Sequence, residues 1–360
     1  MSIDLLHPAE LGDLKLANRI IMAPMTRSRA HADGTPGEHM ATYYAQRASA
    51  GLIVSEAINV SQDAIGSPLT PGLFSDAQVA LWKPVTDAVH AAGGHIVAQL
   101  WHTGRVGHSK VRGGVLPVAP SAIAISGQKH FTGQGMEDYE VPRALSTDEV
   151  KASIADFRSA AQRAKDAGFD GVELHAAFGY LPNQFLVDGA NQRTDAYGGS
   201  IAKRSRYVLE TMQGLVDVWG AQRVGIKLSP VIPFNSMIDS DLTALFTHLL
   251  GELDSLQPGY LHLMNALFPL DAFPHWPRDV LGTFGRLTRS PVVANGGYDL
   301  AGAQAELAAG RADFVSFGSL FVANPDLPAR FAHNAPLAEG DRATFYGGGA
   351  EGYIDYPAIS

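Results

Sequence analysis

Two side chains in one short segment are suited to chemistry at a carbonyl group. His175 ends an apolar run, and Tyr180 follows five residues later. An imidazole N–H stabilises an oxygen on which negative charge develops, and a phenol delivers a proton to a nearby carbon. The pair therefore indicates a reaction that holds a carbonyl oxygen and transfers a proton. The alternative is that His175 is a structural residue, since a lone histidine at a strand end is as often structural as catalytic.

Polar residues end most of the other apolar runs. They are Thr26, Glu56 with Asn59, Gln99, Lys227 with Ser229, Asn265, and two turns that contain glycine, Asn295-Gly296-Gly297 and Phe317-Gly318-Ser319. Glycine lets free backbone N–H groups approach a phosphate closely, so the two turns predict a phosphate site. The alternative is that both are ordinary turns.

The apolar runs alternate with amphipathic helical patterns, and this alternation predicts the fold. Buried strands are expected at Arg19–Ala23, Leu52–Glu56, His95–Leu100, Gly171–His175, Val224–Ser229, Tyr260–Met264, Pro291–Asn295 and Phe314–Phe317. Helices are expected at Glu38–Ala50, Ser75–Ala92, Ser146–Ala167, Lys203–Trp219, Asp241–Leu256, Trp276–Leu287, Leu300–Ala309 and Asp326–Ala332. This order is typical of an α/β protein of the (β/α)8 TIM-barrel class, whose sites lie at the carboxyl ends of the strands. A doubly wound sheet would require a Gly-x-Gly-x-x-Gly turn after an early strand, and the sequence has none there.

Segments outside the strand–helix repeats complete the predicted organisation. Residues 101–145 are too long for an ordinary βα loop, and we expect a capping insertion with strand-like pieces at Ser121–Ser126 and Tyr139–Val141. An N-terminal hairpin is expected before the first barrel strand. The tail Phe345–Pro357 is too aromatic for a disordered end. The whole chain, residues 1–360, is therefore predicted to form a single domain.

The composition excludes several kinds of chemistry and partner. The chain has no cysteine, which rules out thiolate catalysis, cysteine-ligated zinc and iron–sulfur clusters. Its 13 histidines show no spacing typical of zinc, so no metal is predicted. A net charge of −9 without a basic run argues against nucleic acid, and no apolar run is long enough to span a membrane. We expect a cytoplasmic monomer or small homo-oligomer.

Further motifs run in order along essentially the whole chain. They are Asn18–Ile20, Met22–Arg27, Tyr43–Ala48, Ala98–Arg105, Gly168–His175, Asn191–Asp195, Tyr197–Ser200, Ala294–Tyr298, Ala323–Pro328, Thr344–Tyr346 and Glu351–Tyr353. Together these segments resemble the Old Yellow Enzyme family of flavin-dependent ene-reductases. The resemblance implies a (β/α)8 barrel that binds FMN non-covalently at the carboxyl ends of its strands. It also implies that NADPH or NADH reduces the flavin, after which hydride passes to the β carbon of an alkene activated by a carbonyl or nitro group.

The resemblance also implies roles for individual residues. Thr26 would hydrogen-bond the flavin near its N5 atom, and Gln99 would bind its pyrimidine edge. His175 would donate to the substrate oxygen, while Tyr180 would protonate the substrate's α carbon. The remaining implied contacts are Pro24, Met25 and Ala57 along the flavin ring, Asn295, Gly296, Gly297 and Gly318 at the FMN phosphate, and Trp101 and Tyr346 in the substrate pocket.

Four positions depart from the family pattern. Phe178 stands where the family usually has His or Asn as a second donor, so a one-donor oxyanion site is expected unless Asn183 or water compensates. Lys227 replaces an arginine at the flavin, Ser319 replaces an arginine at the phosphate, and Ser67 replaces an aromatic wall of the pocket.

These departures keep alternatives to the ene-reductase open. One is a specialised relative with a weakened FMN or oxyanion site, either a redox-neutral isomerase or a flavin-free ligand-binding barrel. Another is an aldolase-like barrel in which Lys227 forms a Schiff base, although nothing in the sequence predicts that this lysine is desolvated. The main prediction is an FMN-dependent, NAD(P)H-consuming ene-reductase.

Overall fold

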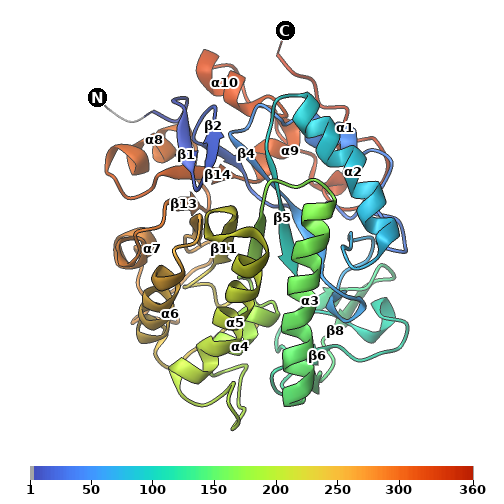
Figure 1. Cartoon of the computed structure of the whole chain (residues 1–360), viewed down its shortest axis with the longest axis vertical. Coiled ribbons are helices and arrows are strands. Elements are labelled where there is room, and N and C mark those ends of the chain that lie inside the picture. The colour runs from blue at the N-terminus through green and yellow to red at the C-terminus, as the bar shows by residue number, and fades with distance from the viewer. Residues whose placement is uncertain (1–3, 360) are drawn as a thin grey trace.

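Eight parallel strands close into a barrel at the centre of the molecule. The computed structural model describes residues 4–359, and Figure 1 shows the course of the chain. The barrel strands are β3 (Ile20–Met22), β4 (Leu52–Asn59), β5 (Ile96–Trp101), β10 (Val172–Ala176), β11 (Val224–Leu228), β12 (Tyr260–Met264), β13 (Val292–Asn295) and β14 (Phe314–Phe317). Each pairs in parallel with the strands before and after it, and β14 pairs with β3 to close the ring. All the expected strands are confirmed.

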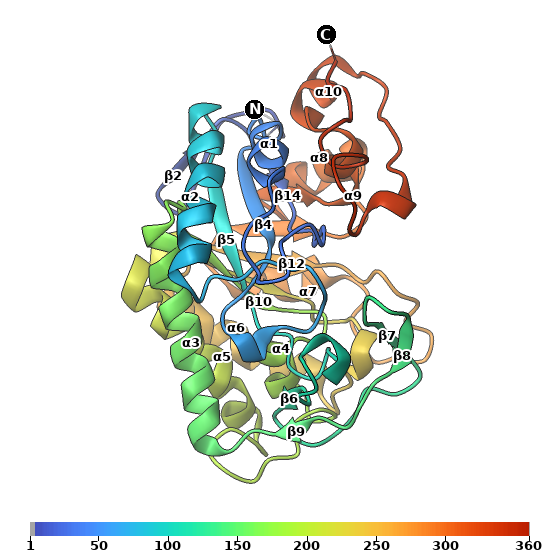
Figure 2. The ribbon, with the colours of Figure 1, turned by 90° about the vertical axis from the view of Figure 1, so that its right-hand side faces the viewer.

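Helices surround the barrel, as Figures 1 and 2 show. They are α1 (Met40–Ala45), α2 (Asp76–Ala91), α3 (Thr147–Asp166), α4 (Leu181–Leu186), α5 (Ile201–Trp219), α6 (Leu242–Leu256), α7 (Val280–Phe284), α8 (Leu300–Ala308), α9 (Ser319–Ala323) and α10 (Leu327–His333). Ser75 and Ser146 begin α2 and α3 through capping boxes, in which the serine and the third helical residue satisfy each other's backbone N–H. The TIM-barrel prediction is therefore confirmed.

Some helical predictions are wrong in detail. The helix expected over Glu38–Ala50 is confined to α1, and the one expected over Trp276–Leu287 is confined to α7. Pro277 limits the latter, because the residue before a proline avoids helical conformation. The sequence pattern predicts neither α4 nor α9. All of α4 is buried, so it has no exposed polar face to give an amphipathic pattern, and α9 has only five residues.

A hairpin closes the amino-terminal end of the barrel. It consists of β1 (Ala9–Leu11) and β2 (Leu14–Leu16), which pair antiparallel. Leu11, Leu14 and Leu16 are buried in one cluster with barrel-lining side chains. The predicted N-terminal hairpin is thus confirmed, and it leaves the carboxyl ends of the strands as the end where the barrel interior opens.

The barrel interior is layered, because alternate residues of each strand point inward. Next to the hairpin the lining is apolar, with Val97, Tyr260, Val293 and Phe314 in one cluster. Two residues further along the same strands come buried polar side chains: Gln99, His262, Asn295 and Ser316. The interior therefore changes from apolar to hydrogen-bonding toward the carboxyl ends of the strands.

The insertion at residues 101–145 is present, but its strands lie elsewhere than predicted. They are β6 (Val118–Ala119), β7 (Lys129–Phe131), β8 (Met136–Asp138) and β9 (Arg143–Ala144). β7 and β8 form a hairpin, which Figure 2 shows at one edge of the molecule, and β6 pairs with β9. Neither Ser121–Ser126 nor Tyr139–Val141 is a strand. Their sequences have the strand pattern, but no neighbouring strand pairs with them.

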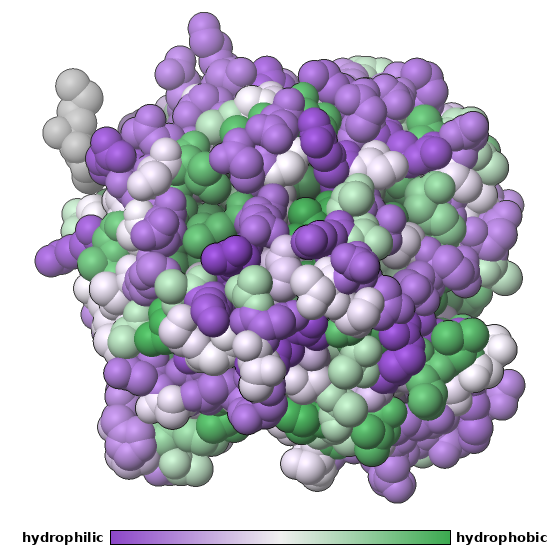
Figure 3. All heavy atoms as spheres, turned by 60° about the horizontal axis from the view of Figure 1, so that its bottom comes forward, coloured by the Kyte–Doolittle hydropathy of each residue, from purple (hydrophilic) through white to green (hydrophobic). Residues whose placement is uncertain are grey.

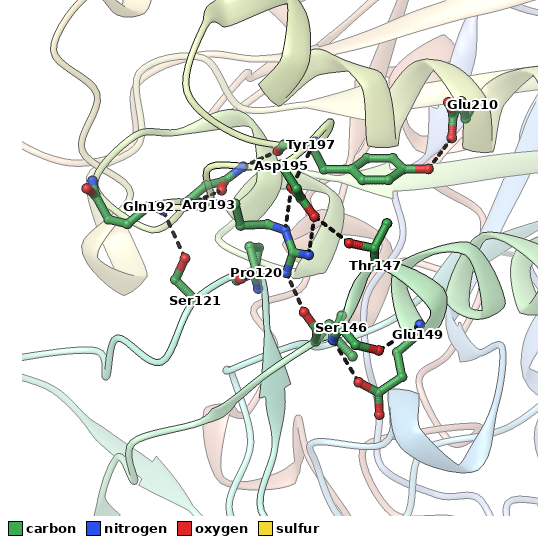
Figure 4. Close-up of polar contacts among 12 residues, drawn as sticks. Pro120, Ser121, Ser146, Thr147, Glu149, Gln192, Arg193, Asp195, Tyr197 and Glu210 are labelled. Carbon is green, nitrogen blue, oxygen red and sulfur yellow. Dashed lines mark hydrogen bonds and ion pairs between the residues drawn. The ribbon is translucent and has the colours of Figure 1, made fainter.

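One guanidinium ties the middle and the carboxyl-terminal end of the insertion to the loop after α4. Arg193 donates hydrogen bonds to the carbonyl oxygens of Pro120, at 3.0 Å, and of Leu145. It also forms a two-pronged ion pair with Asp195, at 3.1 and 2.6 Å (Figure 4). Thr147, at the start of α3, donates to the same carboxylate at 2.7 Å. Arg193 therefore holds the second half of the insertion and fixes where it rejoins the barrel.

The tail over Phe345–Pro357 packs back against the first βα loops. Tyr353 is buried and stacks on Tyr43 with ring centroids 4.2 Å apart. The guanidinium groups of Arg27 and Arg29 lie 5.1 and 4.5 Å from the centre of the Tyr353 ring. This packing confirms that the tail is ordered.

The outer surface is mixed in character. On the face drawn in Figure 3, several separate apolar patches lie among polar side chains. Within residues 4–359, no helix has both the length and the apolar character needed to cross a membrane.

We predict that Arg193→Ala loosens the insertion. The change removes the guanidinium donor from two carbonyl oxygens and the counter-charge from Asp195, which keeps only Thr147 and the Tyr197 N–H as donors. The free energy of unfolding should therefore fall by about 2–3 kcal/mol. Chemical denaturation measures this loss, and limited proteolysis should show earlier cleavage within residues 101–145. The matched control is Arg143→Ala, which removes an ion pair whose side chains are 50% and 42% exposed and should cost below about 1 kcal/mol. Equal effects of the two variants would contradict the anchoring role.

Candidate active site

A cavity of about 930 Å³ opens at the carboxyl ends of the barrel strands. It brings together most of the predicted site residues, although they come from distant parts of the sequence. These are Pro24, Met25, Thr26, Ala57, Ser67, Gln99, Trp101, His175, Phe178, Tyr180, Lys227 and Tyr346. Barrel closure thus assembles one site from the ends of β3, β4, β5, β10 and β11, together with the tail.

Asn183 does not line this cavity. It is buried on α4, and its Oδ1 accepts a hydrogen bond from the Gly179 N–H at 2.9 Å. The side-chain oxygen therefore helps to hold the loop in place, and Asn183 is not among the residues that line the cavity. Its role as a second donor to the substrate oxygen stays a prediction.

The two glycine turns predicted at the phosphate also lie outside the cavity, but next to it. Asn295, Gly296 and Gly297 end and follow β13, while Gly318 and Ser319 follow β14. These strands are neighbours, and β14 pairs with β3, which leads to Pro24 and Met25. A Cβ on Gly318 would lie 3.3 Å from the Met25 Sδ. The turns are thus placed side by side at the edge of the cavity, and their phosphate role stays a prediction.

The predicted catalytic pair is in direct contact. The His175 and Tyr180 rings meet edge to face, with centroids 4.7 Å apart. Trp101 packs against the other side of Tyr180 at 4.9 Å, again edge to face. Tyr180 is also the N-cap residue of α4, so its backbone is fixed at a helix start. Both rings are therefore held in position before any ligand arrives.

The protonation states of this pair suit hydrogen-bond and proton donation. Burial lowers the pKa of His175 well below its ordinary value, and the nearby Lys227 and His262 add to the effect. The neutral imidazole has no hydrogen-bond partner among residues 4–359, so its N–H is free for a ligand. Burial also raises the pKa of Tyr180, which keeps its phenol protonated.

Phe178, which lies between His175 and Tyr180 in the sequence, adopts a left-handed backbone conformation. Its φ is +56°, which costs a non-glycine residue about 1–2 kcal/mol. Hydrogen bonds hold both sides of the residue: its N–H donates to Ser229 Oγ at 2.9 Å, and Asn235 Nδ2 donates to its carbonyl at 2.8 Å. The phenyl ring lines the cavity and offers no donor. The cavity therefore has an apolar ring where a second oxyanion donor would lie.

Gln99 and Lys227 form a polar part of the cavity wall. They are 1% and 4% exposed. Burial lowers the pKa of Lys227 to about 8, and the Glu173 carboxylate opposes that shift. Nothing in the sequence predicts this desolvation, because the groups that enclose Lys227 come from neighbouring barrel strands. At neutral pH the lysine remains mostly protonated.

Several cavity residues were missed by the sequence analysis. They are Ser28, Pro68, Leu69, Val106, Lys129, His130, Phe131, Gly133, Met136, Tyr139, Phe234, Asn235 and Gly347. Part of this set comes from the β7–β8 hairpin, whose turn has Gly133 and Gly135 at positive φ. A Gly-x-Gly turn between short β-type segments is a hairpin signal that could have indicated it. Nothing in the sequence marks Phe234 or Asn235, which lie in a short turn after β11.

The donor set fits FMN. The pyrimidine edge of a flavin carries an N–H between two carbonyl groups, and Gln99 and Lys227 offer an amide and a cation there. Thr26 adds a hydroxyl, and the small Ala57 leaves room for a flat ring. Gly296 and Gly297, at φ of 115° and 75°, provide backbone with no side chain next to the cavity, as phosphate requires. Among residues 4–359, no group of three or more His, Asp or Glu side chains is arranged to hold a metal ion.

Comparison with known proteins agrees with this chemistry. Residues 4–338 match the family described as NADH:flavin oxidoreductase / NADH oxidase. The chain is 42% identical over 363 residues to 12-oxophytodienoate reductase 1 of Oryza sativa subsp. japonica, covering 99% of this chain and 94% of that protein. Among solved structures, morphinone reductase is 46% identical with a TM-score of 0.95, covering 100% of this chain and 97% of that one. The Old Yellow Enzyme homologue from Zymomonas mobilis is 42% identical with a TM-score of 0.95, covering 99% and 100%.

The fold and site define an FMN-dependent oxidoreductase that uses NADH or NADPH as reductant. The chain belongs to the Old Yellow Enzyme family. The resemblance seen in the sequence is thus confirmed, and the flavin-free and aldolase-like alternatives have no support among the relatives.

Glu56 lies next to the cavity residue Ala57 and is fully buried. Its Oε2 accepts a hydrogen bond from the Arg27 N–H at 3.4 Å, and Tyr44 donates to its Oε1 at 3.4 Å. Burial raises the pKa of Glu56 to about 7, although Arg27, Tyr44 and Arg29 oppose the shift. The carboxyl group therefore changes charge near neutral pH, one residue from the cavity wall.

We predict that Glu56 makes the folded protein less stable as the pH rises. The raised pKa means that the folded state binds more protons than the unfolded state between about pH 4.5 and 7. Its stabilising contribution is fully present below this window and is lost as the pH rises through it. The free energy of unfolding of Glu56→Gln, relative to that of the natural chain, should therefore increase by up to about 3 kcal/mol from pH 5 to pH 8. Chemical denaturation of both proteins at the two pH values measures this. In contrast, Glu149→Gln should show no such change, because the pKa of Glu149 is held at about 2 by Arg143 and Ser146. If Glu56→Gln and the natural chain differ in stability by the same amount at pH 5 and pH 8, the prediction is contradicted.

Proposed function

We propose that this oxidoreductase reduces alkenes conjugated to a carbonyl or nitro group, with NADPH or NADH as the electron source. FMN, when bound, supplies the hydride that adds to the β carbon of the alkene. The observation that carries the proposal is the contact between His175 and Tyr180 in the cavity that also contains Gln99 and Lys227.

His175 would hold the activating oxygen of the substrate. Negative charge develops on that oxygen as hydride adds to the β carbon, and the neutral imidazole N–H has no protein partner that competes for it. A single preorganised donor of this kind lowers the barrier by about 3 kcal/mol. Because the ring is neutral, it acts by hydrogen bonding and retains its proton.

Tyr180 would deliver a proton to the α carbon. Its ring is fixed between His175 and Trp101, so the hydroxyl keeps a defined position relative to the oxygen site. The raised pKa of the phenol keeps it protonated at neutral pH. Tyr180 is half-buried in the wall of the open cavity, through which solvent can return the proton after each turnover.

The use of a nicotinamide is supported by a relative. One solved structure is that of morphinone reductase in complex with tetrahydroNAD, and it is 47% identical to this chain with a TM-score of 0.93. We infer that the reductant and the alkene enter the same cavity in turn, because both must reach the same reactive cofactor.

The test combines a spectrum with an assay. The purified protein supplied with FMN should be yellow and should oxidise NADH or NADPH when 2-cyclohexen-1-one is present. Tyr180→Phe should keep the colour and the oxidation of the reductant, but should reduce the enone about 100-fold more slowly or worse. A protein that FMN cannot colour would contradict the proposed function. Equal enone reduction by Tyr180→Phe would contradict the role of Tyr180 alone.

A preference for bulky substrates is favoured by a second observation. Phe131, Met136 and Tyr346 line the cavity and are 55%, 57% and 64% exposed. With Phe178 they give the cavity an apolar wall and mouth, and Ser67 leaves space beside them. We propose that large apolar enones bind better than small ones, since burying this surface adds about 25 cal/mol per Å².

We predict that Phe178→Asn raises activity on small enones. Asparagine tolerates positive φ better than phenylalanine, so the loop should keep its conformation. Its amide adds a second donor near the substrate oxygen, and kcat/KM for 2-cyclohexen-1-one should rise about 10- to 100-fold. Phe178→Leu is the matched control, because it removes the ring without adding a donor. If both variants behave alike, the substrate oxygen is held elsewhere.

A further inference from the structure

A buried carboxylate lies directly behind the polar wall of the cavity. Glu173, on β10, has no exposed surface. Its Oε1 accepts a hydrogen bond from Gln99 Nε2, and its Oε2 contacts His262 Nδ1, each at 2.8 Å. Glu173 does not line the cavity, but both of these contacts lead toward ligand-binding parts of the site; the buried Tyr260 phenol also faces the carboxylate.

The contact with Gln99 fixes which end of the amide faces the cavity. Burial alone would raise the pKa of Glu173, but His262, Lys227 and Gln99 lower it, so the group is ionised. A carboxylate only accepts hydrogen bonds, and it therefore selects the NH₂ end of Gln99. The Gln99 Oε1 has no partner among residues 4–359 and is left as an acceptor for a ligand.

Glu173 also supplies the counter-charge of Lys227. The titratable groups that face this lysine are Glu173 and His175 on β10 and His262 on β12. Glu173 is the carboxylate among them, and it opposes the loss of the Lys227 proton caused by burial. Burial keeps both histidines neutral, so they add no lasting positive charge.

The second contact orients a chain of hydrogen bonds toward the glycine turns. Because Glu173 is ionised, His262 Nδ1 must carry the proton, and the neutral ring then accepts from Ser316 Oγ through Nε2 at 2.7 Å. Asn295 Nδ2 in turn donates to Ser316 Oγ at 2.8 Å. One carboxylate thus sets the donor direction from Gln99 to the start of the Asn295-Gly296-Gly297 turn.

We propose that Glu173 is a positioning residue for FMN, which turns Gln99 Oε1 toward the cavity and maintains the charge of Lys227 beside it. The wall then presents an acceptor next to a cation, and this matches the N–H and the carbonyl of the flavin pyrimidine edge. The inference rests on the proposed use of FMN. It concerns the affinity for FMN and the midpoint potential of the bound flavin before any substrate is added.

The test is the Glu173→Gln variant. His262 Nδ1–H still needs an acceptor, so the new amide would present its NH₂ to Gln99 and force that amide to turn. Gln99 would then offer a donor to the flavin N–H, and the dissociation constant for FMN should rise about 10- to 100-fold. Without its counter-charge, Lys227 should lose its proton at a lower pH. The loss of FMN affinity on raising the pH should therefore begin at a lower pH than in the natural chain. The midpoint potential of the bound flavin should become more negative, because the cation that favours the reduced, more negative flavin is weakened.

Two controls separate this role from general damage to the fold. Asp170 lies just before the same strand, and its carboxylate accepts a hydrogen bond from the Ile96 N–H at 2.8 Å. Asp170→Asn should leave the FMN affinity and the flavin potential unchanged. In a Gln99→Met background, Glu173→Gln should lose the part of its effect that acts through the amide, which a double-mutant cycle measures.

Each outcome bears on a defined statement. A folded Glu173→Gln protein with unchanged affinity, potential and pH profile would overturn the inference. If Glu173→Gln does not fold, Glu173→Asp takes its place, because it keeps the charge but withdraws the carboxylate oxygen from Gln99. This variant should bind FMN more weakly, with an unchanged pH profile. Full FMN affinity of Glu173→Asp would overturn the inference. Failure of the natural chain to bind FMN would instead overturn the proposed function.

Discussion

Parallel closure of the barrel is the constraint on which the rest of the structure depends. All eight strands run in one direction, so their carboxyl ends meet in one place. Side chains alternate along each strand, so every second residue must face the interior. The amino-terminal end is filled by the hairpin leucines and an apolar layer, and the opposite end carries the polar side chains and the cavity. The position of the site thus follows from strand direction and from a period of two residues.

The same constraint explains how much could be predicted from the sequence. Strands buried on both faces appear as unbroken apolar runs, and all eight were found; their last polar residues, such as Gln99 and His175, were therefore placed correctly at the site. The insertion was placed less well, because strands of two or three residues, such as β6 and β7, carry too little pattern. Glu173 and His262 lie inside apolar runs, where a sequence shows neither their contact nor the enclosure of Lys227. These features depend on which strands are neighbours, and that is set by the closed ring.

The polar layer inside the barrel is costly to folding considered alone. A buried carboxylate loses several kcal/mol of hydration, and a neighbouring cation and hydrogen bonds offset this only when their geometry is good. Glu173 has such partners in Gln99, His262 and Lys227, yet an apolar layer like the one below it would hold the barrel closed at least as well. A layer of this kind is expected where binding, rather than stability, sets the choice of residues. The left-handed Phe178, held by Ser229 and Asn235, is a second local cost in the same region.

Reactivity and access are controlled by different parts of the chain. The His175–Tyr180 loop is held by hydrogen bonds to Ser229, Asn235 and Asn183, all close to the barrel, so its geometry should vary little with the ligand. The mouth of the cavity comes instead from the β7–β8 hairpin and the tail, which are attached to the barrel through a few arginines such as Arg193. Changes in these outer segments alter which molecules fit without moving the proton donor or the oxygen site. In a family that shares one barrel, such segments are where differences in substrate should arise, and Phe178 is the exception because it reaches from the catalytic loop into the same apolar wall.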